Sequence, residues 1–173
     1  ITHGMTVGEL ALMLNGEGWL SGGVTCEVEV IKLKNWKHDD DYSLPVRPSP
    51  NLPNDQAVRL YPSICLFEGT VVSVGRGTPT PFQVLGNPEL KMLPYSFTPV
   101  PLKGYSLEPP HKDKLCYGLD LRTVTPARKV NLSFLLQLYQ LYPEKEKFFT
   151  SYFDKLAGTP LLKQQITQGL TEE

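Results

Sequence analysis

The most informative stretch of the chain is CLFEGTVVSVGRGTPTPF, residues 65–82. Its apolar start gives way to an acid, Glu68, and then to the glycine-flanked arginine of Gly75-Arg76-Gly77-Thr78. Prolines crowd the sequence around it, and most of the 16 in the chain lie between Pro45 and Pro110. Because each proline fixes φ and removes a backbone donor, this region is predicted to contain short extended segments and turns instead of long helices.

Helices are expected on both sides of this stretch. Thr6 and Glu9 have the spacing of a capping box, and the apolar periodicity that follows predicts a helix over residues 6–15. Asn54-Asp55 predicts a short helix ending near Tyr61, with Pro62 in the first turn of another. The helices expected toward the C-terminus are 132–143, 144–157 and 160–168, the last two separated by Gly158-Thr159-Pro160.

Strands are expected to be few and short. Residues 24–33 alternate between apolar and polar side chains, which predicts a strand with one solvated face. Further short strands are predicted around 82–85, 95–102 and 115–121, with loops at 17–23 and 34–53. Together these elements predict an α+β fold, with an irregular mixed sheet of short strands, helices at both ends and a helical C-terminal third.

The bulk composition describes one ordinary globular domain. The chain has 173 residues, of which 40% are hydrophobic and 20% charged. The net charge is -1, and Lys and Arg form no basic stripe, so no nucleic-acid partner is expected. No apolar run approaches the roughly 20 residues of a membrane span, so none is expected.

Cysteine and histidine spacing predicts neither a metal site nor a cofactor. Cys26, Cys65 and Cys116 are far apart and stand in apolar contexts, which favours three small core residues. The three histidines, His3, His38 and His111, lie in polar or terminal stretches and are expected on the solvated surface.

Arg76 and Glu68 are the leading candidates for a site. Flanking glycines let a loop approach a ligand closely, and arginine suits bidentate recognition of a carboxylate or phosphate. An acid beside an apolar run, such as Glu68, can be a proton donor or a ligand anchor. The structural alternatives are that Arg76 only pins a tight turn through a neighbouring acid, and that Glu68 is its partner or a helix cap. Local sequence does not decide between them.

Two loops add further candidates. Asn15-Gly16-Glu17-Gly18-Trp19 offers an amide, a carboxylate and an aromatic ring, a set that often grips sugars. A helix end followed by a turn explains the first two residues equally well, and a core position is slightly favoured for Trp19. Asn51 stands in the stiff Pro48-Ser49-Pro50-Asn51 segment, where it is either a ligand contact or a satisfied turn residue.

The motifs together resemble a known family. The blocks, all in order along nearly the whole chain, are Gly4–Ala11 with Asn15-Gly16-Glu17, Val30–Trp36, Pro48–Pro53, Cys65–Thr70 with Ser73–Phe82, Tyr117–Arg122, and Phe153–Thr159. They resemble the exo-acting β-N-acetylmuramidases of the NamZ type, long known as a domain of unknown function.

The resemblance implies a glycosidase that removes N-acetylmuramic acid from the non-reducing end of peptidoglycan fragments, without a cofactor, in cell-wall recycling. It implies a Rossmann-like N-terminal domain, absent here, and an active site in the cleft between that domain and an accessory domain. This chain, 1–173, would be the accessory domain, with 1–35 as the tail of the preceding one. The family's main catalytic glutamate has no match here, and Val71 and Val74 replace an Asn and a Glu found in many members.

The expected site therefore combines Glu68, as a possible second carboxylate, with substrate-binding residues. The substrate-binding set is Arg76, Asn51, Glu17, Gly75, Gly77 and Thr78. The chain alone is expected to be inactive, both of its ends are expected to continue into a longer protein, and the substrate implies a periplasmic or secreted location. The alternative functions are a non-catalytic glycan-binding module and a domain that only braces its neighbour.

Overall fold

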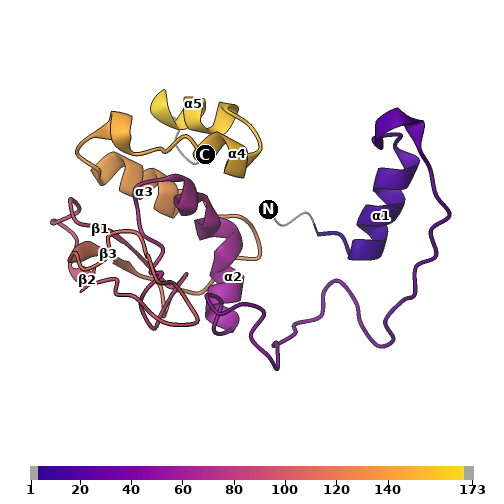
Figure 1. Ribbon diagram of the computed structural model, residues 1–173, viewed down its shortest axis with the longest axis horizontal. Helices are drawn as coiled ribbons and strands as arrows, with labels where there is room; N and C mark the ends of the chain where they lie inside the picture. The colour runs from indigo at the N-terminus through magenta and orange to yellow at the C-terminus, as the bar shows by residue number, and fades with distance from the viewer. Residues whose placement is uncertain (1–3, 170–173) are drawn as a thin grey trace. The chain divides into compact units, whose positions relative to one another are not determined.

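The computed structural model describes residues 4–169 (Figure 1). The chain divides into two compact units, Ile1–Tyr42 and Ser43–Glu173. His3, whose position on the surface was predicted, lies outside the described residues. No helix among those described is long and apolar enough to cross a membrane.

The first unit is organised around helix α1, Val7–Gly16. Its N-terminus is the predicted capping box: Thr6 Oγ1 accepts the Glu9 N–H at 3.2 Å, and Glu9 Oε2 accepts the Thr6 N–H at 2.7 Å. Near the other end, Asn15 donates to the Cys26 carbonyl oxygen and accepts the Cys26 N–H, each at 2.8 Å. The short 3₁₀ helix η1, Ser21–Gly23, lies between these two residues in sequence.

Residues 24–33 are extended, but the predicted strand is wrong. A strand requires a neighbouring strand that exchanges backbone hydrogen bonds, and none of the described residues supplies one. The alternation still has a structural effect, because Val28 and Val30 are half-buried and Val30 packs against Gly8 of α1. Ile31 and Leu33 are 88% and 79% exposed.

The second unit begins with a long helical segment. Helix α2 spans Asp55–Ile64, with the Asn54 side chain accepting the Ala57 N–H at 3.0 Å, and the 3₁₀ helix η2 follows at Cys65–Gly69. Pro62 lies inside α2 and does not start a new helix, contrary to the prediction. The helix continues past it because Ser63 and Ile64 are buried on the same face as Leu60.

Three short strands form an antiparallel sheet in the order β1-β3-β2. They are β1 Val84–Asn87, β2 Tyr95–Phe97 and β3 Cys116–Asp120. The α+β class is confirmed, but the sheet is antiparallel throughout and not mixed. The strand predicted to reach residue 102 ends at Phe97 because Pro99 and Pro101 cannot donate to a ladder.

The C-terminal third is helical, as predicted, although in shorter pieces. The helices are α3 Ser133–Leu141, η3 Lys145–Lys147, α4 Phe153–Ala157 and α5 Leu161–Thr167. Figure 1 shows α4 and α5 at one end of the unit and the three strands at the other. Between them lies a core whose largest fully buried side chains are Phe67, Phe82, Phe148, Phe153, Ile64, Leu85, Leu90, Leu121, Leu135, Leu138, Ile166 and Val84.

Several predictions about single side chains need correction. Cys65 and Cys116 are buried as expected, but Cys26 is exposed, because it lies on the unpaired segment. Trp19 is 62% exposed and is not a core residue. His38 is on the surface, paired with Glu9, but His111 is half-buried with Nε2 2.6 Å from the Val71 carbonyl oxygen, which ties its loop to the core.

Candidate functional site

Glu68 and Arg76 form an ion pair at the surface of the second unit. Arg76 donates from Nε at 2.9 Å and from Nη2 at 2.7 Å, and both bonds go to Glu68 Oε1. Glu68 is on η2, and Arg76 is in the loop that leads toward β1. The Arg76 and Glu68 side chains are 30% and 26% exposed, respectively, so the pair is neither sealed in the core nor free in solvent.

The geometry of the pair leaves hydrogen-bonding capacity for a ligand. A guanidinium has two faces that can each hold a carboxylate, one made by Nε and Nη2 and one made by the two Nη groups. Glu68 occupies the first face through a single oxygen. Among the described residues, Arg76 Nη1 and Glu68 Oε2 have no hydrogen-bond partner. The pair therefore offers a donor fork and a carboxylate oxygen side by side.

The loop that carries Arg76 is fixed by its packing. Gly75 and Gly77 have φ of 78° and 80°, in the left-handed region that glycine adopts most easily. A Cβ on Gly75 would lie 2.5 Å from Val84 Cγ2, and one on Gly77 would lie 2.6 Å from Pro109 Cγ and 2.7 Å from the Val100 carbonyl oxygen. Neither glycine has room for a side chain.

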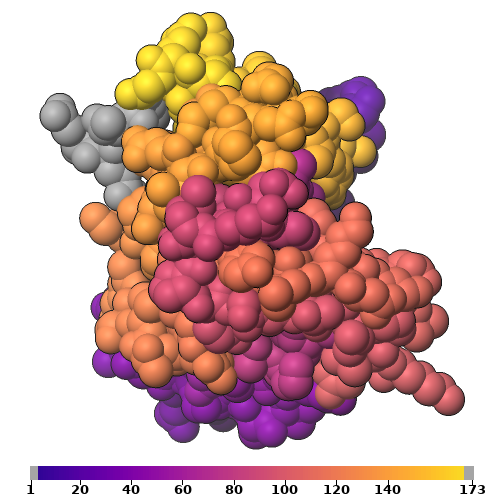
Figure 2. Space-filling model, turned by 90° about the vertical axis from the view of Figure 1, so that its left-hand side faces the viewer, coloured from indigo at the N-terminus to yellow at the C-terminus, as the bar shows by residue number. Residues whose placement is uncertain are grey.

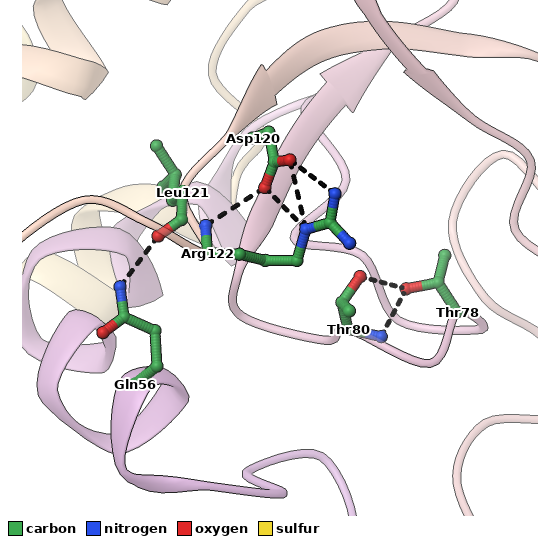
Figure 3. Close-up of polar contacts among 6 residues, drawn as sticks. All are labelled: Gln56, Thr78, Thr80, Asp120, Leu121 and Arg122. Carbon is green, nitrogen blue, oxygen red and sulfur yellow. Dashed lines mark hydrogen bonds and ion pairs between the residues drawn. The ribbon is translucent and has the colours of Figure 1, made fainter.

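Thr78 is a structural member of this loop. Its hydroxyl donates to the Gly75 carbonyl oxygen at 2.7 Å and accepts the Thr80 N–H at 3.1 Å. Thr78 is 6% exposed. The side chain closes the turn around Arg76, and Figure 3 shows the Thr78–Thr80 contacts beside the end of β3.

Arg76 of the pair packs against one aromatic ring, and a second ring packs against the first. The Arg76 Cζ atom lies 5.1 Å from the centroid of the Phe82 ring, and the Tyr61 ring of α2 lies 5.0 Å from the same ring. Burial and the nearby charges of Cys65 and Glu68 raise the pKa of Tyr61, while Arg76 lowers it. Tyr61 and Phe82 were not predicted as site residues, and neither side chain stands out in a single sequence.

A second arginine pair lies at the end of β3, within the Tyr117–Arg122 block. Arg122 donates to both carboxylate oxygens of Asp120, with Nη2 at 2.6 Å from Oδ2, and its guanidinium lies 5.8 Å from the Tyr95 ring centroid (Figure 3). The side-chain hydrogen bond from Arg122 lowers the pKa of Asp120. Unlike Arg76, Arg122 is bound to a residue only two positions away, so it stabilises the strand end locally.

Asn51 is buried apart from the pair. It is 9% exposed, its Nδ2 donates to the Tyr105 carbonyl oxygen at 3.4 Å, and its Oδ1 has no partner among the described residues. Arg47 donates to the Tyr105 hydroxyl at 2.6 Å and lies over its ring. Asn51 thus belongs to a cluster with Arg47 and Tyr105, and no hydrogen bond connects it to Glu68 or Arg76.

The structure brings together most of the predicted site. Glu68, Arg76, Gly75, Gly77 and Thr78 form one continuous feature. Glu17 belongs to the Ile1–Tyr42 unit, where it is the exposed C-cap of α1 and its N–H donates to the Met13 carbonyl oxygen at 2.9 Å.

The two valines of the motif are packing residues. Val74 is 2% exposed and Val71 packs against the same core, so neither offers a polar group to a ligand. No group of three or more potential metal ligands occurs within residues 4–169. The two charged groups of the site are the Glu68 carboxylate and the Arg76 guanidinium.

Comparisons with known proteins match the whole chain. The family model for the C-terminal part of exo-β-N-acetylmuramidase NamZ matches residues 59–173, and the model for the N-terminal part matches residues 1–56. The peptidoglycan β-N-acetylmuramidase NamZ of Bacillus subtilis strain 168 is 37% identical over 192 residues. That match covers 100% of this chain and 45% of the relative, so the chain spans less than half of its length.

Two crystal structures from Bacteroides fragilis NCTC 9343, both of DUF1343 family proteins, have the same fold. The first has a TM-score of 0.93 and 46% identity, and the match covers 99% of this chain and 49% of that one. The second has a TM-score of 0.71 and 24% identity, with 93% and 48% covered, and shows likeness of fold alone.

Proposed function

The chain belongs to the exo-β-N-acetylmuramidase NamZ family, and from this premise we propose that it forms one wall of the sugar-binding cleft of a glycoside hydrolase. The enzyme would release N-acetylmuramic acid from the non-reducing end of peptidoglycan fragments. A Rossmann-like N-terminal domain would supply the other wall and the main catalytic carboxylate. The full-length protein, meaning that domain together with this chain, would be active, and the chain alone inactive.

The observation that carries the proposal is the partly exposed Glu68–Arg76 pair. N-acetylmuramic acid differs from N-acetylglucosamine by a lactyl ether that bears a carboxylate, so a selective site must read that charge. The Nη1–Nη2 face of Arg76 is left open by Glu68, and it suits a carboxylate held by two parallel hydrogen bonds. Arg76 would therefore both hold Glu68 in place and bind the lactyl group.

Glu68 would be the second carboxylate of the reaction. Glycosidases normally use two carboxyl groups, which flank the glycosidic bond that is broken. Glu68 Oε1 accepts both bonds from Arg76, which fixes the side chain, and Oε2 has no hydrogen-bond partner among the described residues. That oxygen can orient the sugar or exchange a proton with a water molecule.

Asn51 and Glu17 would bind sugar hydroxyls. Asn51 has a buried carbonyl oxygen with spare accepting capacity, and its 3.4 Å bond to Tyr105 is long. Glu17 is a separate candidate within the Ile1–Tyr42 unit, where its carboxylate stands on the exposed turn after α1 and can accept a sugar hydroxyl.

The proposed substrate also implies where in the bacterial cell the protein acts. Peptidoglycan fragments with terminal muramic acid occur in the cell envelope, so we propose a periplasmic or secreted location. Cell fractionation with an antibody against this chain tests it, and recovery of the protein in the cytosolic fraction alone contradicts it.

Replacement of Arg76 by alanine in the full-length protein tests the function. With chromogenic muramic-acid and glucosamine glycosides, Arg76→Ala should slow both reactions, because Glu68 loses its partner. It should reduce kcat/KM for the muramic substrate about 10- to 100-fold further than for the glucosamine substrate, the range for a charged hydrogen bond to the lactyl carboxylate. Arg122→Ala is the matched control, because it also breaks an arginine–carboxylate pair, and it should preserve the ratio. An equal loss on both substrates, or none, contradicts the role of Arg76 in specificity.

One observation favours a second candidate, a non-catalytic glycan-binding module. Among the described residues, Glu68 is the single carboxylate at the pair, and the two valines of the motif are packed in the core. Titration of the full-length protein with N-acetylmuramic acid, together with an assay for its release, separates the two functions. Binding without release supports the binding module.

A further inference from the structure

The backbone of Phe82 adopts a conformation that a bulky residue rarely takes. Its φ is 56°, in the left-handed region that favours glycine, although the side chain is 1% exposed in the core. The Phe82 N–H donates to the Val74 carbonyl oxygen at 2.7 Å, which closes the loop that contains Arg76. Such conformations persist where the surroundings enforce them, and they cluster at ligand sites.

The ring of Phe82 lies where it can hold the arginine. The Arg76 guanidinium is 5.1 Å above it, and Tyr61 packs against the same ring at 5.0 Å, tilted by 52°. Because Tyr61 is on α2, the helix braces the ring and the ring braces the arginine. A cation over an aromatic face gains electrostatic stabilisation that an aliphatic side chain of similar size does not provide.

Arg76 has few other restraints on its own direction. Within the described part of the chain its hydrogen bonds all go to one oxygen, Glu68 Oε1, around which the guanidinium plane can still turn. The ring beneath it fixes that plane and hence the direction of the Nη1–Nη2 face. A face held in this way binds a carboxylate without the entropy cost of ordering a long side chain.

We propose that Phe82 is a positioning residue, whose strained backbone and braced ring aim the open face of Arg76 at the carboxylate of the ligand. The inference rests on the proposed function for the identity of that ligand, the lactyl carboxylate. The positioning itself concerns only residues of this chain. It can therefore be measured without any sugar.

The first experiment measures exchange of the Arg76 Nε proton by NMR in the 173-residue chain. Phe82→Leu removes the ring and keeps an apolar side chain, and it should accelerate exchange roughly tenfold, as expected for the loss of a cation–π contact. Phe148→Leu is the matched control, because Phe148 is as deeply buried as Phe82. Its aromatic neighbours are Tyr139, Tyr142 and Phe149, and not Arg76. It should leave Arg76 unchanged.

The second experiment links the positioning to specificity. In the full-length protein, Phe82→Leu should lower the preference for muramic over glucosamine substrates by about three- to tenfold, with the loss in KM and not in kcat. Phe148→Leu should keep the preference. If the wild type shows no such preference, the proposed function fails, while the exchange measurement still decides the role of Phe82.

Two outcomes overturn the inference. One is an Arg76 Nε proton that exchanges equally slowly in wild type and Phe82→Leu, and the other is an equal effect of Phe148→Leu. Should Phe82→Leu not fold, Phe82→Met repeats the test with a side chain that adapts more easily to the cavity. In the wild type, the Arg76 side-chain protons must also show the upfield shift of protons above a ring, and its absence contradicts the geometry.

Discussion

Arg76 and Glu17 both stand between two glycines, yet their loops are built in opposite ways. At Gly75 and Gly77 a Cβ would collide with Val84, Pro109 and a backbone carbonyl. At Gly16 and Gly18 a Cβ would have no neighbour within 4 Å. The same sequence pattern therefore marks a loop held rigid by packing in one unit and an open turn in the other. A rigid loop can select between ligands, whereas an open one can only add contacts.

The largest expected effect comes from filling the space at Gly77. Gly77→Ala places a Cβ within 2.7 Å of Pro109 and Val100 at a φ of 80°, so we expect a destabilisation of about 3 kcal/mol from overpacking and backbone strain together. Gly104→Ala is the matched control, because its φ is 81° with open space around it, and about 1 kcal/mol is expected. Urea unfolding of the chain measures both.

The difference between the two alanine variants isolates the collision from the backbone conformation. If Gly104→Ala costs as much as Gly77→Ala, the loop of Arg76 is no more constrained by packing than an open turn. The contrast between the two loops would then disappear. The argument for a preorganised arginine would disappear with it.

The sequence indicates the glycine-flanked loop and its arginine, but not the packing that holds them. Positive φ at Gly75 and Gly77 follows from glycine chemistry, and the pairing of Arg76 with Glu68 was one of two alternatives that local sequence left open. The positive φ of Phe82 could not be predicted, because nothing in its side chain favours that region. It follows from tertiary contacts with Tyr61 and the Val74 carbonyl group.

The extended segment 24–33 shows a different limit of sequence reasoning. Apolar alternation correctly indicates a side that is partly covered: Val28 and Val30 are half-buried, and Val30 packs against Gly8 of α1. Whether that chain becomes a strand depends on a partner that its own sequence does not specify. The strands predicted in the second unit form a sheet, because each finds its partner within residues 84–120.

A smaller effect is expected from Glu17, the counterpart of Arg76 in the open loop. Since sugar hydroxyls are present in muramic acid and glucosamine alike, Glu17→Gln in the full-length protein should weaken both substrates about equally, by roughly fivefold, the worth of one hydrogen bond. The ratio of the two kcat/KM values should not change. A change in that ratio would assign specificity to the open loop and contradict the comparison.

The smallest effect concerns the helix that leads into the open loop. Hydrogen bonds from the Thr6 backbone and from His38 lower the pKa of Glu9 from 4.5 to about 2. Because the pKa is depressed in the folded helix, the contribution of Glu9 is complete above its ordinary value and is lost as the pH falls toward 2. Chemical shifts of the α1 amides should therefore report fraying of the helix as the pH falls from 4.5 to about 2.

The control is Glu9→Gln, which retains the capping box without the charge. Its α1 shifts should not depend on pH over the same range. If the variant frays like the wild type, other acids govern this unit, and the N-terminal cap does not set the stability of the helix before Glu17.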